Sequence, residues 1–174
     1  MVIVKRVVLV ILVLIACPSA AQQAPDEHAL RAAMVFNLML FVDWPAATLD
    51  QAPQIRLCFI SESSETTRAF NSLGGRQVKS RGLEVHRRGP LAALGDCHAV
   101  YLDDLPSDLI ADKLASIAAQ PVLTLASSPD SGAMIDVTLI DNRLVFDVSA
   151  DTLRKAGLSL ASRVMQLARN VHRR

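Results

Sequence analysis

Short apolar segments with β-strand character alternate with helical segments through the middle of this chain, and this alternation constrains its fold more than any other feature. The strand-like segments are IRLCFIS (55–61), LEVHRR (83–88), HAVYLDD (98–104) and PVLTLA (121–126). The helical segments between them are SSETTRAFNSL (63–73), a single turn at PLAAL (90–94), and a stretch from Pro106 to about Ala119. Strands that alternate with helices favour a sheet with helices packed against it.

A predicted hairpin and a closing helical stretch follow. The strand-like segments MIDVTLI and RLVFDVS flank Asp141-Asn142, a dipeptide that suits a tight hairpin turn. Beyond them, residues 151–156 and 158–171 have helical character and are separated by Gly157. The sequence therefore predicts an α/β fold, in which a single domain holds a mixed β-sheet of about five to six strands flanked by helices.

Residues 28–42 contain no helix breaker and predict a helix that precedes the sheet. Between Ala29 and Val42 only Arg31 and Asn37 are polar, so this helix is apolar on nearly every side. One side can cover the sheet, and the others need further helices, a second subunit or a partner. A buried amide must be hydrogen bonded, and we interpret this segment as a core helix in which the Asn37 amide is paired.

Trp44-Pro45 marks the end of the predicted helix, because proline disfavours helical geometry in the residue before it. We expect the indole to fold back over the helix end as an apolar cap.

The N-terminus has the layout of a secretory signal, in which Lys5 and Arg6 precede an apolar run at 7–16 and small residues follow. The run is about half of the roughly 20 residues that a membrane-spanning helix needs. We expect cleavage after Ala21, which gives a signal peptide at 1–21 and an exported domain at 22–174. A minor alternative is lipoprotein processing, since Leu14-Ile15-Ala16-Cys17 resembles a lipobox and would make Cys17 an acylated N-terminus.

The charge distribution argues against nucleic-acid binding. Cleavage would remove Lys5 and Arg6 and lower the formal net charge from +1 by two, to −1. Arg87-Arg88 and Arg173-Arg174 are short, isolated and not interleaved with aromatic residues, so no basic patch is predicted.

Cys58 and Cys97 are the two cysteines of the predicted exported domain, and an even number in such a domain predicts a disulfide. Each lies in or beside a predicted strand, so neighbouring strands can bring them together. Two alternatives stay open, namely a pair of buried free thiols and a thiol–metal site that uses the adjacent His98.

The sequence contains no recognisable catalytic motif, such as GxSxG, HExxH, a Walker A loop or GxGxxG. Asp103-Asp104 ends a predicted strand, where carboxylates can bind a ligand or a metal, although such a pair is more often a solvated entrance to a helix, here the one that Pro106 opens. Ser127, Ser128 and Ser131 follow another strand, where loops of α/β sheets often contact ligands. The four histidines, His28, His86, His98 and His172, are scattered. We therefore predict that the protein is not an enzyme and has no cofactor.

Several segments, in order, resemble the YfiR-like family of periplasmic proteins. RAAMVFNLMLFVDWP (31–45) is similar to the N-terminal signature of that family, [KR]AAxxYNFxxFxxWP. Phe36 stands in place of the tyrosine, Leu38 in place of the phenylalanine, and Asp43 in place of the common glutamate. The further similar segments are IRLCFIS (55–61), LGGRQVKSRGLEVHR (73–87), GDCHAVYLD (95–103), PVLTLA (121–126) and GAMIDVTLIDNRLVFDVSADTLRKAGLSLASRVMQLA (132–168).

The resemblance implies a non-enzymatic periplasmic regulator. Well-understood members bind the periplasmic sensor domain of an inner-membrane diguanylate cyclase, YfiN, and hold it inactive, which lowers cyclic di-GMP and biofilm formation. An outer-membrane lipoprotein, YfiB, sequesters the repressor. Other members accompany sensor kinases or TonB-dependent receptors, so the alternative function is a small-ligand-binding or accessory domain for such a system.

The resemblance also implies a homodimer and a set of site residues. Cys58 and Cys97 match one disulfide of the family, whereas a second, more C-terminal pair is absent because no cysteine follows Cys97. The signature places Asn37, Phe41, Trp44 and Pro45 on the segment that we expect to carry the dimer or partner surface.

Overall fold

The structure is a computed structural model that describes residues 26–172. The predicted signal peptide at 1–21, its cleavage site and the Cys17 alternative lie outside the described residues. Among residues 26–172, no helix is both long enough and apolar enough to cross a membrane.

The elements follow one another largely in the predicted alternation. The helices are α1 (Glu27–Leu40), α2 (Ala46–Asp50), α3 (Ser64–Asn71), α4 (Ser107–Ile117), α5 (Ala150–Lys155) and α6 (Ser162–Met165). The strands are β1 (Val42–Asp43), β2 (Gln54–Ile60), β3 (Gln77–Val78), β4 (Arg81–Arg87), β5 (Ala99–Leu102), β6 (Leu123–Ala126), β7 (Ile135–Ile140), β8 (Arg143–Ser149), β9 (Ser159–Leu160) and β10 (Asn170–His172).

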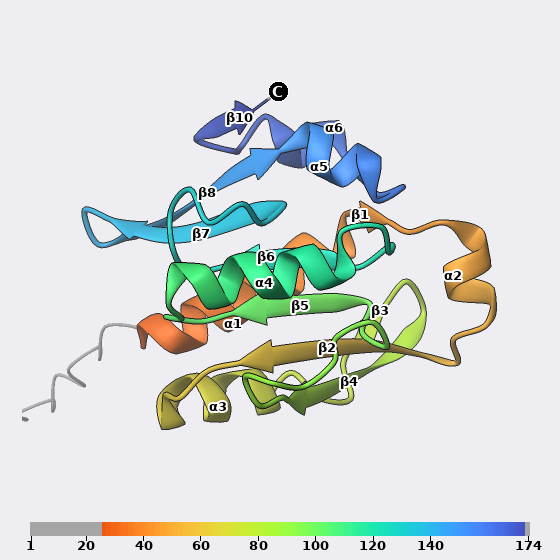
Figure 1. The fold of residues 1–174 in the computed structure, drawn as a ribbon, viewed down its shortest axis with the longest axis horizontal. Coiled ribbons are helices and arrows are strands. Elements are labelled where there is room, and N and C mark those ends of the chain that lie inside the picture. Colours follow the sequence, from red (N-terminus) through yellow and green to blue (C-terminus); the bar gives the residue numbers. More distant parts are fainter. Residues whose placement is uncertain (1–25, 173–174) are drawn as a thin grey trace, which may run out of the picture.

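Eight of these strands form one mixed sheet in the order β10-β8-β7-β6-β5-β2-β4-β3 (Figure 1). The central strands β4, β2, β5 and β6 are parallel, β7 and β8 form an antiparallel hairpin, and β10 pairs with β8 in parallel. The predicted mixed sheet with flanking helices is confirmed. Its strand number was underestimated because β3 and β10 have only two and three residues, too few to produce a recognisable pattern.

Helices cover both faces of this sheet, with α1 and α3 on one face and α4 on the other (Figure 1). Neighbouring residues of β2 alternate between the two faces, as strand geometry requires. Leu57 and Phe59 belong to the core on the α1 side, whereas Cys58 and Ile60 belong to the core on the α4 side. The sheet therefore separates two hydrophobic layers.

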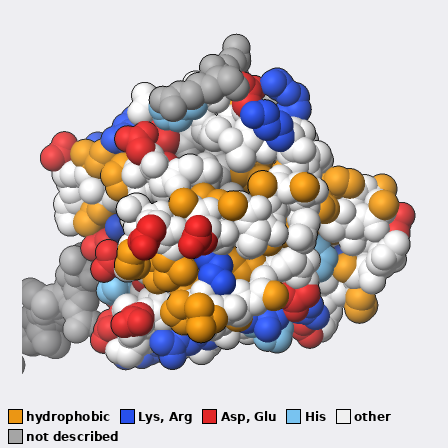
Figure 2. All heavy atoms as spheres, viewed as in Figure 1, with side chains coloured by type: hydrophobic (Ala, Val, Ile, Leu, Met, Phe, Trp, Pro, Cys, Tyr) orange, Lys and Arg blue, Asp and Glu red, His pale blue; other side chains and the backbone are white. Residues whose placement is uncertain are grey.

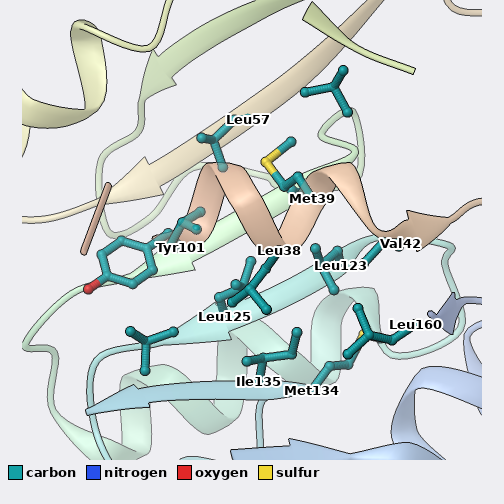
Figure 3. Packing of buried hydrophobic residues seen from close by; sticks show 14 of the residues in the cluster. Leu38, Met39, Val42, Leu57, Tyr101, Leu123, Leu125, Met134, Ile135 and Leu160 are labelled. Atoms are coloured by element: carbon teal, nitrogen blue, oxygen red, sulfur yellow. The ribbon is translucent and has the colours of Figure 1, made fainter. Parts of the chain in front are cut away.

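The larger hydrophobic layer lies between α1 and the sheet (Figure 3). Leu38 and Met39 of α1 point toward the strands and are at most 4% exposed. Phe70 of α3 extends this layer, with its ring 4.7 Å from that of Tyr101 and 5.2 Å from that of Phe59. Buried aromatic contacts of this kind contribute about 0.5–1.5 kcal/mol each beyond their area, so α3 is fixed firmly to the sheet.

The segment after α1 differs from the prediction. The helix ends at Leu40 rather than at Val42, and Val42–Asp43 form β1, which pairs with β9 in a small second sheet. The Trp44 indole does not cap the helix end. It is 6% exposed and its Nε1 donates to the His98 carbonyl oxygen at 3.0 Å, so it joins the chain after α1 to the start of β5. The extended conformation of β1 places the indole there.

Residues 158–171 were predicted as a helix, and this prediction is wrong. Gly157 has a φ of +74°, a left-handed conformation that turns the chain out of α5. The next residues form β9, the single helical turn α6, and β10. Pairing of β9 with β1 and of β10 with β8 overrides the helical spacing of the local sequence.

Two smaller predictions have opposite outcomes. The hairpin turn at Asp141-Asn142 is confirmed, and both residues are left-handed, with φ values of 48° and 59°. Such a pair of angles is typical of the type I′ turns that join antiparallel strands. PLAAL (90–94) forms a turn at its first two residues and is irregular after them, so the predicted single helical turn is absent.

Candidate partner-binding surface

The outward side of α1 carries a row of mostly apolar residues that the domain leaves partly or largely exposed. Leu30, Ala33, Met34, Asn37 and Phe41 recur at the three- and four-residue spacing that places side chains on one helix face. Leu30 is 40% exposed. Asn37 is also exposed, so the interpretation of a core helix with a buried, paired asparagine is wrong.

This row forms one wall of a groove, which we call the α1 groove, with a volume of about 630 Å³. The other walls come from the start of β8 and from α6 and the residues after it. The lining residues are Leu30, Ala33, Met34, Asn37, Leu38, Phe41, Asn142, Arg143, Leu144, Phe146, Val164 and Leu167. Leu167 is 74% exposed, so the groove is open to solvent.

The apolar surface continues beyond the groove onto β7. Leu139 pairs directly with Leu144 in the hairpin, so the two side chains share one face of the sheet, and Leu139 is 37% exposed. Exposed apolar residues are unremarkable when scattered singly, whereas a contiguous patch marks an interaction site. The opposite, α4 side of the molecule is different, since acidic, basic and apolar side chains are interspersed there (Figure 2).

The groove has a positive rim. Arg143 is part of its lining, and no carboxylate is. The Arg163 guanidinium lies 4.7 Å from the centre of the Phe41 ring, in a cation–π contact at the end of the groove. Among the described residues, neither arginine has an ion pair, whereas Arg56, Arg88 and Arg154 each pair with an aspartate.

The four signature residues divide into two pairs with different positions. Asn37 and Phe41 line the α1 groove. Trp44 is buried in the main core, and Pro45 precedes α2, where its ring lies close to Gly157. Trp44 and Pro45 therefore do not form part of the groove, and they position the segment that leaves α1.

Cys58 and Cys97 form a disulfide whose Cα atoms are 5.9 Å apart. The bond lies in the smaller hydrophobic layer, on the α4 side of the sheet and away from the α1 groove. Within residues 26–172, these cysteines and Asp96 are the only three candidate metal ligands that lie together. Because the disulfide uses both sulfur atoms, that group offers no thiolate to a metal.

Asp103 is a buried carboxylate at the end of β5 and is already hydrogen bonded within the protein. The hydroxyl groups of Ser61 and Thr66 donate to its Oδ2 at 2.7 and 2.8 Å. A polar pocket of about 320 Å³ beside it also borders Ser127 and Ser128, in the loop where the alternative function expects a ligand. Buried polar groups that bond one another in this way stabilise the fold, so the pocket is a weaker candidate than the groove.

The remaining sequence candidates do not assemble into a catalytic site. Ser131 donates to Asp136 and Asp104 donates its backbone N–H to Ser127 at 2.8 Å, so both contacts fix loops. His28 contacts Thr66, whereas His86 lies beside Glu84 on β4. Burial lowers the pKa of His98, and the nearby charges of Arg56 and Arg81 lower it further.

The family resemblance placed Asn37 and Phe41 on the expected partner surface, but sequence reasoning missed most of the groove. The i, i+3, i+4, i+7 and i+11 spacing of Leu30, Ala33, Met34, Asn37 and Phe41 was a usable signal. No local signal links them with Arg143 and Leu167, because β8 and the segment after α6 approach α1 only in the folded chain.

Comparison with known proteins identifies the family. Among curated proteins, none matches the chain. The sequence model of the family described as YfiR/HmsC-like matches residues 28–169, which include nearly all of α1, every strand of the main sheet except β10, and α6. The match confirms the resemblance seen in the ordered sequence segments, and this chain belongs to the YfiR/HmsC-like family.

Proposed function

We propose that this chain is a non-enzymatic periplasmic regulatory protein that binds the periplasmic sensor domain of an inner-membrane diguanylate cyclase and represses the enzyme. Repression would lower cyclic di-GMP and biofilm formation. Membership of the YfiR/HmsC-like family supports a role in diguanylate cyclase regulation. The α1 groove is the observation that carries the proposal, because it is an open apolar surface suited to a protein partner.

Repression through binding requires no chemistry from this chain. The protein has only to bind the inactive state of the cyclase more tightly than the active state. A shift from an even balance to 99% inactive corresponds to about 2.7 kcal/mol of differential binding free energy. Burial of a few apolar side chains in the groove can contribute that much, since a fully buried leucine or phenylalanine contributes about 1.5–3 kcal/mol.

The proposal includes export, assembly and a second partner. A signal peptide at 1–21 would direct residues 22–174 to the periplasm, where a disulfide such as Cys58–Cys97 persists. The protein would act as a homodimer. An outer-membrane lipoprotein similar to YfiB would sequester it and release the cyclase.

Deletion and complementation test the function. We expect deletion of the gene to raise cyclic di-GMP, and the wild-type gene to restore the lower level. Leu167→Glu should fail to restore it, because a carboxylate would enter the α1 groove. Leu91→Glu is the matched control, since Leu91 is 94% exposed, is not part of the groove, and should complement fully.

Melting temperatures of the two purified variants show whether both are folded. If deletion leaves cyclic di-GMP unchanged and no diguanylate cyclase co-purifies with the wild-type protein, the proposed function is wrong.

A further inference from the structure

The outward row of α1 has the length and the character of a helix-binding surface. From Leu30 to Phe41 it extends about 16 Å, or three helical turns, at 1.5 Å per residue. The backbone N–H groups of α1 are used within the helix, so this wall offers side chains only. A helix satisfies its own backbone hydrogen bonds and needs only side-chain contacts from this wall, whereas an extended peptide would find no backbone partner on it. The shape therefore favours an amphipathic helix as the occupant.

The charges of the groove select among amphipathic helices. Arg143 and Arg163 lie at the groove and are exposed. Neither forms an ion pair with another residue in the described part of the chain. The lining contains no carboxylate. A helix with carboxylates beside its apolar face would pair with these arginines, whereas a helix with lysines there would be repelled. Such rim charges contribute chiefly to partner choice and to the rate of association.

A second copy of this chain fits the groove less well than an acidic helix does. It would present the same two unpaired arginines and a groove lining without a carboxylate. Glu27, an acidic residue in the first turn of α1, is already paired with Arg31 at 2.7 Å. Where two grooves faced each other, the arginines of one would meet no carboxylate in the lining of the other.

We propose that the α1 groove binds an amphipathic helix of the partner protein, with apolar residues at three- and four-residue spacing that pack on Leu30, Met34 and Phe41, and with carboxylates that pair with Arg143 and Arg163. This inference rests on the proposed function, because it names the chemistry of the partner segment. It adds that the partner segment is helical and acidic.

Binding of designed peptides tests the inference directly. Two fluorescein-labelled peptides share one face of leucines at positions i, i+3, i+4, i+7 and i+11, and differ only in carrying glutamates or lysines beside that face. Fluorescence anisotropy with the mature protein should give a Kd about tenfold lower for the glutamate peptide, since it forms two exposed ion pairs that the lysine peptide cannot form. The preference should weaken as salt rises, because exposed charges are screened.

Substitutions in the groove assign the preference to the two arginines. The double variant Arg143→Gln/Arg163→Gln should bind both peptides about equally. Arg154→Gln should retain the wild-type preference, because Arg154 is an exposed arginine outside the groove that pairs with Asp151. Equal binding of the two peptides to the wild-type protein would overturn the inference. Failure of both to bind, together with a dimer mass that Leu167→Glu reduces to a monomer mass, would overturn it in favour of a second copy.

The two proposals fail in different experiments. If the protein shows no preference for the glutamate peptide but deletion still raises cyclic di-GMP, the acidic-helix inference is wrong and the proposed repressor function stands. If the protein clearly prefers the glutamate peptide but deletion leaves cyclic di-GMP unchanged, the acidic-helix inference stands and the proposed repressor function is wrong.

Discussion

At the scale of single residues, His98 connects three parts of the molecule. Its carbonyl oxygen accepts from the Trp44 indole at 3.0 Å and from the Leu123 backbone N–H at 2.9 Å. Its Nδ1 accepts from the Arg56 backbone N–H at 3.0 Å, a contact that requires the neutral ring to be unprotonated at that nitrogen. Burial, followed by the charges of Arg56 and Arg81, lowers the pKa of His98.

A lowered pKa in the folded state makes the protein less stable as the solution becomes acidic. An unfolded histidine has a pKa of about 6.5. Below that pH the unfolded chain therefore carries more bound protons at this histidine than the folded chain does. We expect the free energy of unfolding to fall as pH decreases from about 6.5 toward the lower pKa of the folded state. His98→Asn should flatten this part of the profile, because asparagine accepts the same hydrogen bond and does not titrate. Urea unfolding over this pH range measures the effect.

His86 provides the control for that experiment, because it is exposed on β4. If His98→Asn lowers the slope no more than His86→Asn does, the acid sensitivity does not come from His98.

At the scale of elements, the β7–β8 hairpin carries one wall of the groove, and its turn is the local feature that most restricts sequence. Asp141 and Asn142 are both left-handed. Residues with branched side chains adopt this conformation poorly, and a left-handed residue other than glycine costs roughly 1–2 kcal/mol. Asparagine tolerates it better because its short polar side chain bonds locally.

Asn142→Val should therefore destabilise the protein by about 1–2 kcal/mol, although Asn142 is exposed. Asn142→Gly is the matched variant, and it should retain or slightly raise the stability because glycine adopts positive φ without strain. Urea denaturation midpoints of the two variants measure the difference. Equal midpoints would show that the turn conformation does not limit the stability of the hairpin.

The elements also show where sequence reasoning succeeds and where it stops. The central strands, α3, α4 and the hairpin follow from local patterns, and the structure confirms them. The helix predicted at 158–171 fails because Leu160 pairs with Val42 across a long stretch of chain, and local periodicity does not contain that contact.

The candidate site was partly predictable for the same reason. An all-round apolar helix indicates burial on several sides but does not say which sides the domain itself covers. Asn37 was assigned to the core, whereas the structure places it on the outward row with Leu30 and Met34. Arg143 and Arg163 are 20 positions apart, and they become neighbours of α1 only when β8 and α6 pack beside it in the folded chain.

At the scale of the whole molecule, stabilisation and recognition are separated by the sheet. The disulfide lies in the hydrophobic layer beneath α4, and the α1 groove opens on the other side. Cys58 lies in β2 and Cys97 precedes β5, its parallel neighbour. The bond closes a segment with a sequence separation of 39, which includes α3, β3 and β4.

Reduction should therefore lower stability without changing recognition. In the chain-entropy model, a loop of this length corresponds to about 4 kcal/mol of stabilisation. We expect dithiothreitol to lower the urea midpoint of the wild-type protein to near that of the Cys58→Ala/Cys97→Ala variant, and to leave the variant unchanged.

Thiol labelling of the denatured protein, with and without prior reduction, checks that the bond is present, and equal labelling would show that it is absent. At temperatures where the reduced protein is still folded, it should bind the glutamate peptide with an unchanged Kd, because none of the groove residues belongs to the disulfide layer. A Kd that rises on reduction while the protein stays folded would show that the two faces of the sheet are coupled, and the disulfide would then regulate partner binding as well as stabilising the fold.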